Sequence, residues 1–384
     1  MTEFQYQFYA QKVIFGPGSL NGIKEAIEEF RLQRLLLVTT KGFRTRGYLE
    51  AIEKKLGEQL IATYDNVQAH VQEVQVKEAL AIADKNDIDA IIGLGGGSAI
   101  GIAKAVSLAL EEKRTGSSAK ATYPTEQPLI PVIAIPTTYA GSEMTPVYGV
   151  TYEQGDSKRK VTVKDVKVTP KLTIYDPELT VGLPQSVTAG SGINALAHCI
   201  EALYSITKNP MSTAVALGGI QSIGRSLVQC HEDGTSLSAR TEMLSGSFLA
   251  GVALANVEMG LHHGVCHVLG GSAGISHGDA NSIMLPHVMR FNLDETAPQL
   301  ALAADAMGIN IKEKSVEEAG EAAIDRIADW IQQMYLPQRL RDVGVAETAL
   351  SNLAQVAFGS QTVHNNPKSI KNVEQLEKLF RKAW

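Results

Sequence analysis

The segment Ala90-Ile91-Ile92-Gly93-Leu94-Gly95-Gly96-Gly97-Ser98 decides the fold. It starts as an apolar run typical of a buried strand, and a helical stretch over about residues 99–110 follows it. A strand that ends in glycines just before a helix lets the backbone approach a phosphate group, and the helix N-terminus favours the negative charge. Ser98 could cap this helix and donate its hydroxyl. Because the segment lacks the G-x-G-x-x-G fingerprint and follows a late strand, a turn without a ligand is the alternative.

The same order of strand and helix extends to both sides of this segment. Four further apolar runs are typical of buried strands, at residues 12–15, 35–39, 61–64 and 130–135. Amphipathic stretches lie between them, at residues 20–30, 48–56 and 73–85. This alternation predicts a parallel sheet covered by helices. Residues 111–127, which contain Gly116-Ser117-Ser118, are expected to form an exposed loop.

The texture of the sequence changes at about Leu183, beside Pro184. Beyond it, segments rich in Ala, Leu and Gly at helical spacing continue to Trp384, without convincing strands. We therefore predict an α/β domain at residues 1–182 and an all-helical domain at residues 183–384.

Charge and composition exclude several classes of partner. The 384 residues carry a formal net charge of -6 without long runs of like charge, so neither nucleic acid nor an anionic membrane is expected as the main partner. No stretch approaches the roughly 20 apolar residues of a membrane span, and the N-terminal residues do not resemble a signal peptide. The three cysteines do not form a disulfide pattern, so a cytoplasmic protein is expected. An anionic substrate would need a local cationic pocket.

A second polar loop, at residues 136–146, follows the next predicted strand. It contains Thr137, Thr138 and the pair Gly141-Ser142. Ligands of open α/β sheets bind at the carboxyl ends of the strands, where this loop and the glycine segment would meet. Two polar loops from neighbouring strands favour a ligand site over a solvated turn.

Most of the nine histidines fall between residues 198 and 277. Asn194 and His198 are spaced to share one helix face, and so are His263 and His267. His277 follows near a probable helix break. A lone histidine on an apolar helix is usually a core residue, but two such faces and a third position favour function. The residues suit either a divalent metal site or a metal-free pocket for acid–base catalysis and carboxylate binding.

These motifs together resemble the iron-containing alcohol dehydrogenase family. The resemblance rests on residues 95–98, 136–138 and 192–201, on the three histidines from His263 to His277, and on residues 276–287. It covers almost the whole chain in order. It implies an N-terminal α/β nucleotide domain, a C-terminal helical domain, an active site in the cleft between them and a homodimer.

By the same resemblance, a set of residues would line NADH or NADPH. They are Gly95, Gly96, Gly97, Ser98, Thr137, Thr138, Ser142, Lys160 and Leu179. Thr40-Lys41-Gly42 follows the second strand, where strict NAD enzymes place an acid for the ribose hydroxyl. Since Lys41 would tolerate a 2′-phosphate, we expect use of both cofactors, with Thr40 beside them; the alternative is that Lys41 is only a solvated surface residue.

The resemblance also implies a metal position at residues 194, 198, 263 and 277, with His267 beside the nicotinamide. Metal-dependent members place an aspartate where this chain has Asn194, whose amide offers a cation only a neutral oxygen. Three histidines alone can still hold zinc. An asparagine there is typical of the maleylacetate reductase branch, which the loop at 136–146 and Ala69-His70-Val71 also resemble. Gly264 departs from that branch, which commonly carries a basic residue there.

The expected reaction is hydride transfer to the alkene of maleylacetate, a dicarboxylate, giving 3-oxoadipate in the breakdown of aromatic compounds. Hydride addition builds an enolate that hydrogen-bond donors stabilise without a metal, and easily protonated histidines favour a dicarboxylate. His263 and His267 are the candidates for acid catalysis or enolate stabilisation. His198 and His277 are the candidates for carboxylate binding, and His70 is a further, weaker candidate from the other domain. The alternative is an iron- or zinc-dependent alcohol dehydrogenase or aldehyde reductase. More distant alternatives are enzymes of the dehydroquinate synthase or glycerol-phosphate dehydrogenase type, and an inactive nucleotide-binding protein.

Overall fold

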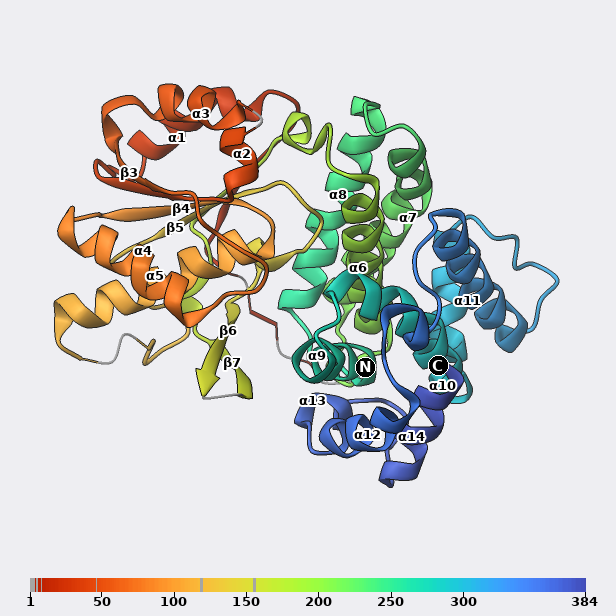
Figure 1. Ribbon diagram of the computed structural model, residues 1–384. Helices are drawn as coiled ribbons and strands as arrows, with labels where there is room; N and C mark the ends of the chain where they lie inside the picture. The colour runs from red at the N-terminus through yellow and green to blue at the C-terminus, as the bar shows by residue number, and fades with distance from the viewer. Residues whose placement is uncertain (1–3, 5, 8, 46, 118–119, 155–156) are drawn as a thin grey trace. The chain divides into compact units, whose positions relative to one another are not determined.

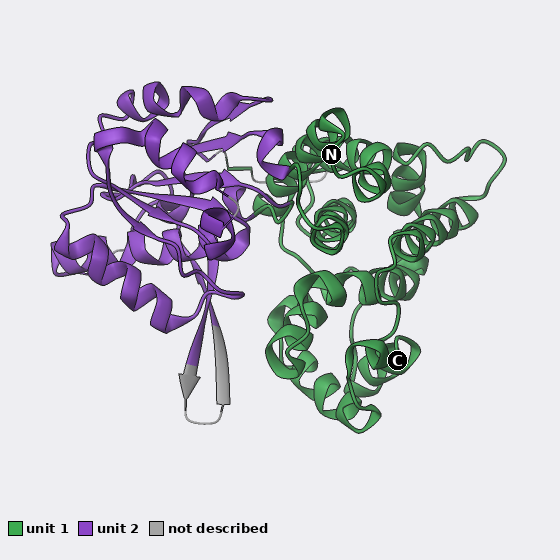
Figure 2. Ribbon diagram, turned by 45° about the horizontal axis from the view of Figure 1, so that its top comes forward, with its two compact units in different colours: residues 1–7, 139–141, 181–384 green, residues 8–138, 142–180 purple. Residues whose placement is uncertain are grey.

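The computed structural model describes residues 4, 6–7, 9–45, 47–117, 120–154 and 157–384, with only the backbone of 153–154 and 157–160. It forms two compact units (Figure 2). Unit 1 contains residues 1–7, 139–141 and 181–384, and unit 2 contains residues 8–138 and 142–180. The short segment 139–141 thus belongs to unit 1 while both of its neighbours along the chain belong to unit 2.

Unit 2 is built on a six-stranded sheet with the order β1-β8-β5-β4-β2-β3, and all of its neighbouring pairs are parallel. The strands are β1 (Lys12–Phe15), β2 (Leu35–Val38), β3 (Leu60–Tyr64), β4 (Ala90–Gly95), β5 (Val132–Pro136) and β8 (Leu172–Tyr175). The expected parallel sheet is confirmed. Strand β8 was not expected, and neither was the antiparallel hairpin of β6 (Val147–Gln154) and β7 (Ser157–Lys164).

Helices cover both faces of this sheet (Figure 1). Helices α1 (Ile23–Glu28), α2 (Lys41–Thr45) and α3 (Tyr48–Leu56) lie on one face, and α4 (Glu73–Lys85) and α5 (Gly97–Thr115) lie on the other. Alternate strand residues pack into two hydrophobic cores, one on each face of the sheet. Leu35 and Leu37 pack with α1 and α3, while Leu36 and Val38 pack with α4 and α5. Burial on both faces explains why these strands read as continuous apolar runs.

Helix α5 is longer than the sequence predicted, and the loop expected at residues 111–127 is wrong for residues 111–115. Glu111 is buried in this helix, where it accepts a hydrogen bond from Lys167 Nζ at 2.6 Å. Gly116 then ends the helix in the left-handed conformation, with φ of 68°. Glu111 can therefore lie inside the helix, since Lys167 pairs with its charge. The sequence did not indicate this, because Lys167 lies far from Glu111 along the chain.

Unit 1 is helical throughout the part that the structure describes, as expected. Its helices are α6 (Gln185–Tyr204), α7 (Pro210–Glu232), α8 (Leu237–Ala255), α9 (Leu261–Ala273), α10 (His277–Ala306), α11 (Val316–Gln333), α12 (Leu350–Phe358), α13 (Gln361–His364) and α14 (Val373–Lys382). Helix α9 packs with α10, α12 and α13 around a core that includes Leu261, Val265 and Val363. Cys199, Cys230 and Cys266 are buried and free. Among the described residues, no helix has both the length and the apolar character of a membrane span.

Candidate active site

The carboxyl ends of β2, β4 and β5 form the part of unit 2 that suits a nucleotide. Strand β3 lies on one side of β2 and β4 lies on the other, so the chain changes direction across the sheet between β2 and β4. Open α/β sheets bind ligands beside such a switch point, at the carboxyl ends of the strands. The glycine segment follows β4 at this place, and Thr40 follows β2.

The glycines bring the loop after β4 against the loop after β5. Gly95 has φ of +142°, a conformation that side chains rarely permit. A Cβ atom on Gly96 would lie 3.0 Å from Thr138 Oγ1. The Thr137 N–H donates to the Gly95 carbonyl at 3.0 Å. Since Gly96 is the N-cap of α5, the free N–H groups of the first helical turn lie beside Thr138 and can receive a pyrophosphate.

The other residues expected around the cofactor are distributed around the same sheet. Ser142 begins a short 3-10 helix, η3 (Ser142–Met144), beyond β5, and Leu179 lies in η5 (Pro177–Thr180), just after β8. Lys160 lies in β7, where its backbone is opposite Thr151. The Lys160 side chain lies outside the described residues. The structure therefore brings Gly95–Ser98 together with Thr137 and Thr138, while Ser142 and Leu179 follow strands of the same edge.

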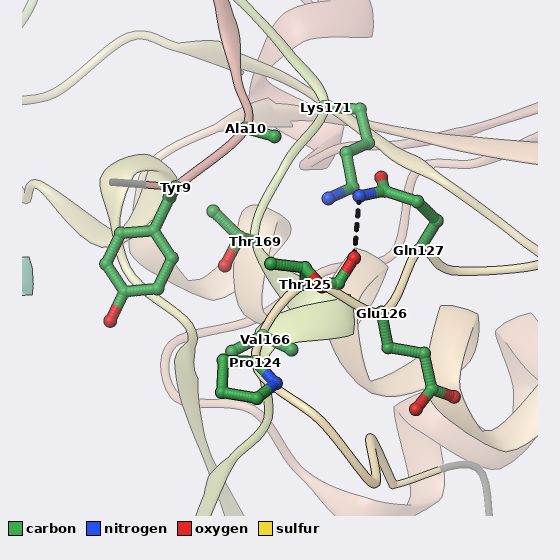
Figure 3. Close-up of a pocket in the computed structure, with 9 residues that line it drawn as sticks. All are labelled: Tyr9, Ala10, Pro124, Thr125, Glu126, Gln127, Val166, Thr169 and Lys171. Atoms are coloured by element: carbon green, nitrogen blue, oxygen red, sulfur yellow. Dashed lines mark hydrogen bonds between the residues drawn. The ribbon is translucent and has the colours of Figure 1, made fainter. Parts of the chain in front are cut away.

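A small pocket of unit 2 lies elsewhere (Figure 3). Gln127, which precedes β5, and Lys171, which precedes β8, both line it, so it lies at the amino ends of these strands. Its other lining residues include Tyr9, Thr125 and Thr169. The glycine segment is at the opposite ends of the strands, so this pocket is not the expected cofactor site.

The histidines form a row in unit 1, carried by three helices. His198 is on α6, His263 and His267 are on α9, and His277 is the first residue of α10. The His198 and His263 rings stack with their centroids 4.8 Å apart. The centroids are 6.4 Å apart from His263 to His267, and 5.8 Å apart from His267 to His277. The row runs from the buried His198 to the exposed His267 and half-buried His277. Such a gradient suits a ligand that enters from solvent and binds inside.

Close contacts between glycines let these helices approach. A Cβ on Gly190 of α6 would lie 3.2 Å from the Cα of Gly278 on α10. A Cβ on Gly270 of α9 would lie 3.4 Å from His277 Cε1. A Cβ on Gly141 would lie 3.5 Å from His198 Nδ1. The positions of the rings thus depend on small residues, of which only Gly141 stood out in the sequence.

Gly264 of α9 is also held by packing. A Cβ there would lie 2.5 Å from Val363 Cγ2 and 3.0 Å from the Val363 backbone nitrogen on α13. Real Cβ atoms essentially never come so close. The basic residue that the branch commonly carries at this position would therefore not fit here without a shift of Val363.

Glu201 is a residue of this site that reasoning from the sequence missed. It is buried at the end of α6, and its carboxylate accepts a short hydrogen bond from His263 Nδ1. The same carboxylate accepts from the N–H groups of Gly260, His262 and His263 at the start of α9, at 3.2, 3.0 and 3.2 Å. An isolated acid in the apolar stretch 195–204, one turn beyond His198, was the available signal.

This contact fixes the direction of His263. Because Nδ1 is engaged by Glu201, the opposite ring nitrogen, Nε2, is the one left for a ligand. Nε2 is buried and has no hydrogen-bond partner among the described residues, and the same holds for His198 Nδ1. Two stacked rings thus each present a buried nitrogen whose partner must come from outside the chain or from solvent.

The charges of the site follow from burial and from neighbouring groups. Burial alone would raise the pKa of the Glu201 carboxyl, but the His263 ring and its hydrogen bond lower it below its ordinary value. Burial, assisted by the neighbouring histidine rings, lowers the pKa of His198 well below its usual value. Burial also lowers the pKa of His262 to about 4. The expectation of easily protonated histidines is therefore wrong for His198, which is neutral at pH 7.

Two expected residues lie apart from the row. Asn194 is half-buried on α6, one turn before His198. His70 belongs to unit 2, where it is exposed and has φ of +63°. The loop that carries it is anchored by its neighbour Val71, whose carbonyl accepts from the Thr151 N–H at 2.7 Å. Val71 also packs on helix α5, since a Cβ on Gly101 would lie 2.6 Å from its Cγ2.

The donor set fits a metal ion only in part. The nitrogens of His198 and His263 that lack partners among the described residues are suitable ligands. His277 follows farther along the row, with His267 between it and His263. The Glu201 carboxylate is already engaged by three N–H groups and by His263 Nδ1. Position 194 supplies a neutral amide. A metal would therefore meet neutral nitrogen donors without the negative ligand that usually accompanies them.

Comparisons with known proteins cover the whole chain. The model described as iron-containing alcohol dehydrogenase matches residues 10–177, and that of the C-terminal part of the Fe-containing alcohol dehydrogenase family matches residues 188–384. A maleylacetate reductase from Pseudomonas knackmussii is 32% identical over 99% of this chain and 97% of its own length. The crystal structure of a maleylacetate reductase from a Rhizobium species is 30% identical with a TM-score of 0.84, covering 100% of this chain and 99% of that one. A 1,3-propanediol oxidoreductase structure is 31% identical with a TM-score of 0.89, covering 100% of both chains.

Proposed function

The chain belongs to the iron-containing alcohol dehydrogenase family and is an NAD(P)-dependent oxidoreductase, and we propose that it reduces maleylacetate to 3-oxoadipate with NADH or NADPH. The proposal is carried by one observation: Asn194 stands where the metal-dependent members have an aspartate, one turn before His198 on helix α6. The maleylacetate reductases among its relatives support the same substrate.

The missing carboxylate favours an anionic substrate over a cation. Aspartate at position 194 would place a negative charge beside His198, and a dicarboxylate would be repelled by it. The neutral Asn194 amide instead donates hydrogen bonds. His198 Nδ1 and His263 Nε2 lack partners among the described residues. Because His263 Nδ1 donates to Glu201, its Nε2 donates to a carboxylate or enolate oxygen only when the ring carries both protons, whereas a neutral His198 ring can donate from Nδ1. The site therefore offers a dianion hydrogen-bond donors without a carboxylate at position 194.

The reaction is a hydride addition followed by a protonation. When bound, the reduced cofactor supplies a hydride to the alkene carbon farther from the ketone, and the electron pair of the double bond moves toward the ketone oxygen. We propose that His263, held by Glu201, stabilises the enolate oxygen. His267 delivers the proton to the remaining alkene carbon, which completes the product. His198 and His277 bind the substrate carboxylates.

The glycine edge of unit 2 is proposed to hold the cofactor. The first turn of α5 and the residues Thr138 and Ser142 would receive the pyrophosphate, and Thr40 and Lys41 the ribose end. The exposed Lys41 and the absence of an acid in Thr40-Lys41-Gly42 support use of both NADH and NADPH. The proposal includes a homodimer, which the family resemblance supports. It also includes the cytoplasm as the location, which the three free cysteines support.

The test compares the chelator-stripped protein with an Asn194→Asp variant. We expect the stripped wild type to oxidise NADH with maleylacetate as fast as untreated protein. Asn194→Asp should lose this activity by about tenfold or more, because it adds a charge beside a dianion, and should bind zinc or iron more tightly in metal analysis. Asn310→Asp, an exchange in a loop of the same unit, is the control and should change neither property.

The opposite result would favour the alternative function. Stripped protein that is inactive with maleylacetate and regains activity with iron or zinc would indicate a metal-dependent alcohol dehydrogenase or aldehyde reductase. The observation behind this alternative is that His198, His263 and His277 remain, since three histidines alone can hold a catalytic zinc. In that case these three residues would hold the ion, which would polarise a carbonyl oxygen.

A further inference from the structure

Lys104 is a fully buried lysine on helix α5, about two turns after the glycine segment. Its Nζ donates to the carbonyl oxygens of Ser142, Thr145 and Val147 at 2.6, 2.7 and 3.0 Å. It also lies 3.3 Å from Thr145 Oγ1. Every one of these oxygens belongs to one stretch of chain, residues 142–147. The ammonium group of Lys104 thus binds three carbonyl groups of one backbone turn, residues 142–147.

The partners of this lysine are unusual for a buried cation. A buried charge normally needs a charged partner, because moving it out of water is costly. The nearby Glu143 is also buried, but its Oε1 accepts from Tyr175 OH at 2.9 Å, and no hydrogen bond joins it to Lys104 among the described contacts. Burial lowers the pKa of Lys104 to about 7, and Glu143 offsets this only in part. A methionine would fill this space without that cost, so the charge indicates a task other than filling the core.

The stretch 142–147 is also held from the sheet side, since Gln11 Nε2 donates to the Glu143 carbonyl at 2.8 Å and Tyr175 OH donates to the Glu143 carboxylate at 2.9 Å. Strand β5 is tied to β4 up to the pair Gly95 and Pro136. Residues 139–141 then belong to unit 1, and the chain returns to unit 2 at Ser142. The next strand, β6, begins only at Val147. Between these points, Lys104 supplies hydrogen bonds that fasten the returning chain to the helix whose first turn carries Gly97 and Ser98.

We propose that Lys104 is a positioning residue for the cofactor, which sets Ser142 and the turn after it relative to the first turn of α5. It does not touch the cofactor; it acts through the backbone of residues 142–147. This inference rests on the proposed function in one respect, namely that unit 2 binds a dinucleotide at the carboxyl edge of its sheet. It does not depend on which substrate is reduced.

The test replaces Lys104 with methionine and uses a second buried lysine of unit 2 as the control. Lys167 is also buried, but it pairs with Glu111 and Glu126 at 2.6 and 2.7 Å and contacts neither cofactor loop in the described structure. The dissociation constant of NADH is measured by fluorescence titration, and kcat, KM for NADH and Tm are measured beside it. Lys104→Met should raise Kd and KM for NADH about tenfold while kcat at saturating NADH changes less than about threefold. Lys167→Met should lower Tm and leave Kd and KM as in the wild type.

The inference is overturned if Lys104→Met lowers Tm as Lys167→Met does but binds NADH like the wild type. Should Lys104→Met not fold, Thr145→Val gives the same decision. It removes a hydroxyl that contacts both Lys104 Nζ and, at 3.0 Å, the Ser142 carbonyl. We expect a two- to fivefold rise in Kd, and an unchanged Kd would overturn the inference. Wild-type protein that binds NADH but does not reduce maleylacetate would refute the proposed substrate alone, whereas wild-type protein that binds neither NADH nor NADPH would refute both.

Discussion

The two candidate sites of this protein are built from different parts of the chain. At the carboxyl edge of the unit 2 sheet, the surface for a ligand is made by backbone: two glycines, a helix N-terminus and a turn held through its carbonyl groups. In unit 1, the site is made by side chains, and three helices each contribute histidines to one row.

This difference decides what a substitution does. A backbone site tolerates changes of chemistry but not of volume, because an added Cβ occupies the space of the ligand or of the facing loop. A side-chain site loses its chemistry when one ring or its buried partner is removed. The following experiments test this contrast, from the largest expected effect to the smallest.

Removal of the central ring should have the largest effect. His263→Ala removes the nitrogen that we assign to the enolate, so kcat/KM for maleylacetate should fall about 10²- to 10³-fold while Kd for NADH stays within about twofold. His364→Ala removes an exposed histidine of the same unit and should have no effect. Steady-state kinetics and NADH titration measure both quantities. Near-normal turnover of His263→Ala would take this residue out of the mechanism.

The buried partner of that ring should have the next largest effect. Glu201→Gln keeps the shape but loses the charge that accepts from His263 Nδ1 and from the start of α9. We expect kcat to fall about 10- to 100-fold, as for other residues that orient a functional histidine. The free energy of unfolding should fall by about 1.5–3 kcal/mol, since hydrogen bonds to a charged acceptor are lost.

The control for this variant is Glu242→Gln, which breaks an exposed pair with Arg225 and should change the free energy of unfolding by less than about 1 kcal/mol. Urea denaturation and kinetics on both variants separate stability from turnover. If Glu201→Gln lost stability but kept its kcat, Glu201 would support the fold of α9 and not the direction of His263.

A methyl group at the backbone site should act on cofactor binding alone. In Gly96→Ala the new Cβ would lie 3.0 Å from Thr138 Oγ1 and beside the first turn of α5. We expect KM for NADH to rise about tenfold, equivalent to about 1.4 kcal/mol, with kcat nearly unchanged. Gly22→Ala is the control, because a Cβ there meets no atom within 4 Å. A fall in kcat with an unchanged KM for NADH would contradict the assignment of this edge to the cofactor.

The last experiment measures stability alone and concerns the buried charge behind the backbone site. Burial lowers the pKa of Lys104 to about 7, whereas the unfolded chain keeps this proton up to about pH 10.5. Between these values the unfolded state binds more protons, so this group makes the protein more stable as pH rises from 7 to 10. The difference in the free energy of unfolding between the wild type and Lys104→Met should change in favour of the wild type by at most about 1.4 kcal/mol per pH unit.

Urea denaturation of both proteins at pH 7, 8, 9 and 10 measures this difference. Glu143 and Tyr175, which lie in the surroundings of Lys104, are present in both proteins. Parallel curves for the two proteins would show that Lys104 keeps its proton over the whole range and is stabilised by its carbonyl partners more strongly than burial penalises it.

The contrast between the two sites also explains how far the sequence could predict them. Gly95–Ser98 is local: strand, glycines and helix are consecutive, so its role in the fold could be predicted from the segment alone. The i, i+4 spacing placed Asn194 with His198 and His263 with His267 on their helices for the same reason.

What the sequence could not supply depends on contacts between distant residues. The pairing of Glu201 with His263 and the grip of Lys104 on residues 142–147 join positions that no local pattern links. The end of α5 was misplaced because Glu111 pairs with Lys167. His198 looked available for protonation, but its burial is a property of the assembled helices.

The contact between Gly264 and Val363 restricts how this protein can change over evolutionary time. A basic residue at position 264, as in the branch that the chain resembles, would collide with both the side chain and the backbone of Val363. Trimming Val363 alone would leave its backbone nitrogen 3.0 Å from the new Cβ, so α13 would also have to give by a few tenths of an ångström. A larger shift of α13 without the new side chain would leave a void beside α9, which lowers stability. The residue at position 264 and the position of α13 are therefore coupled.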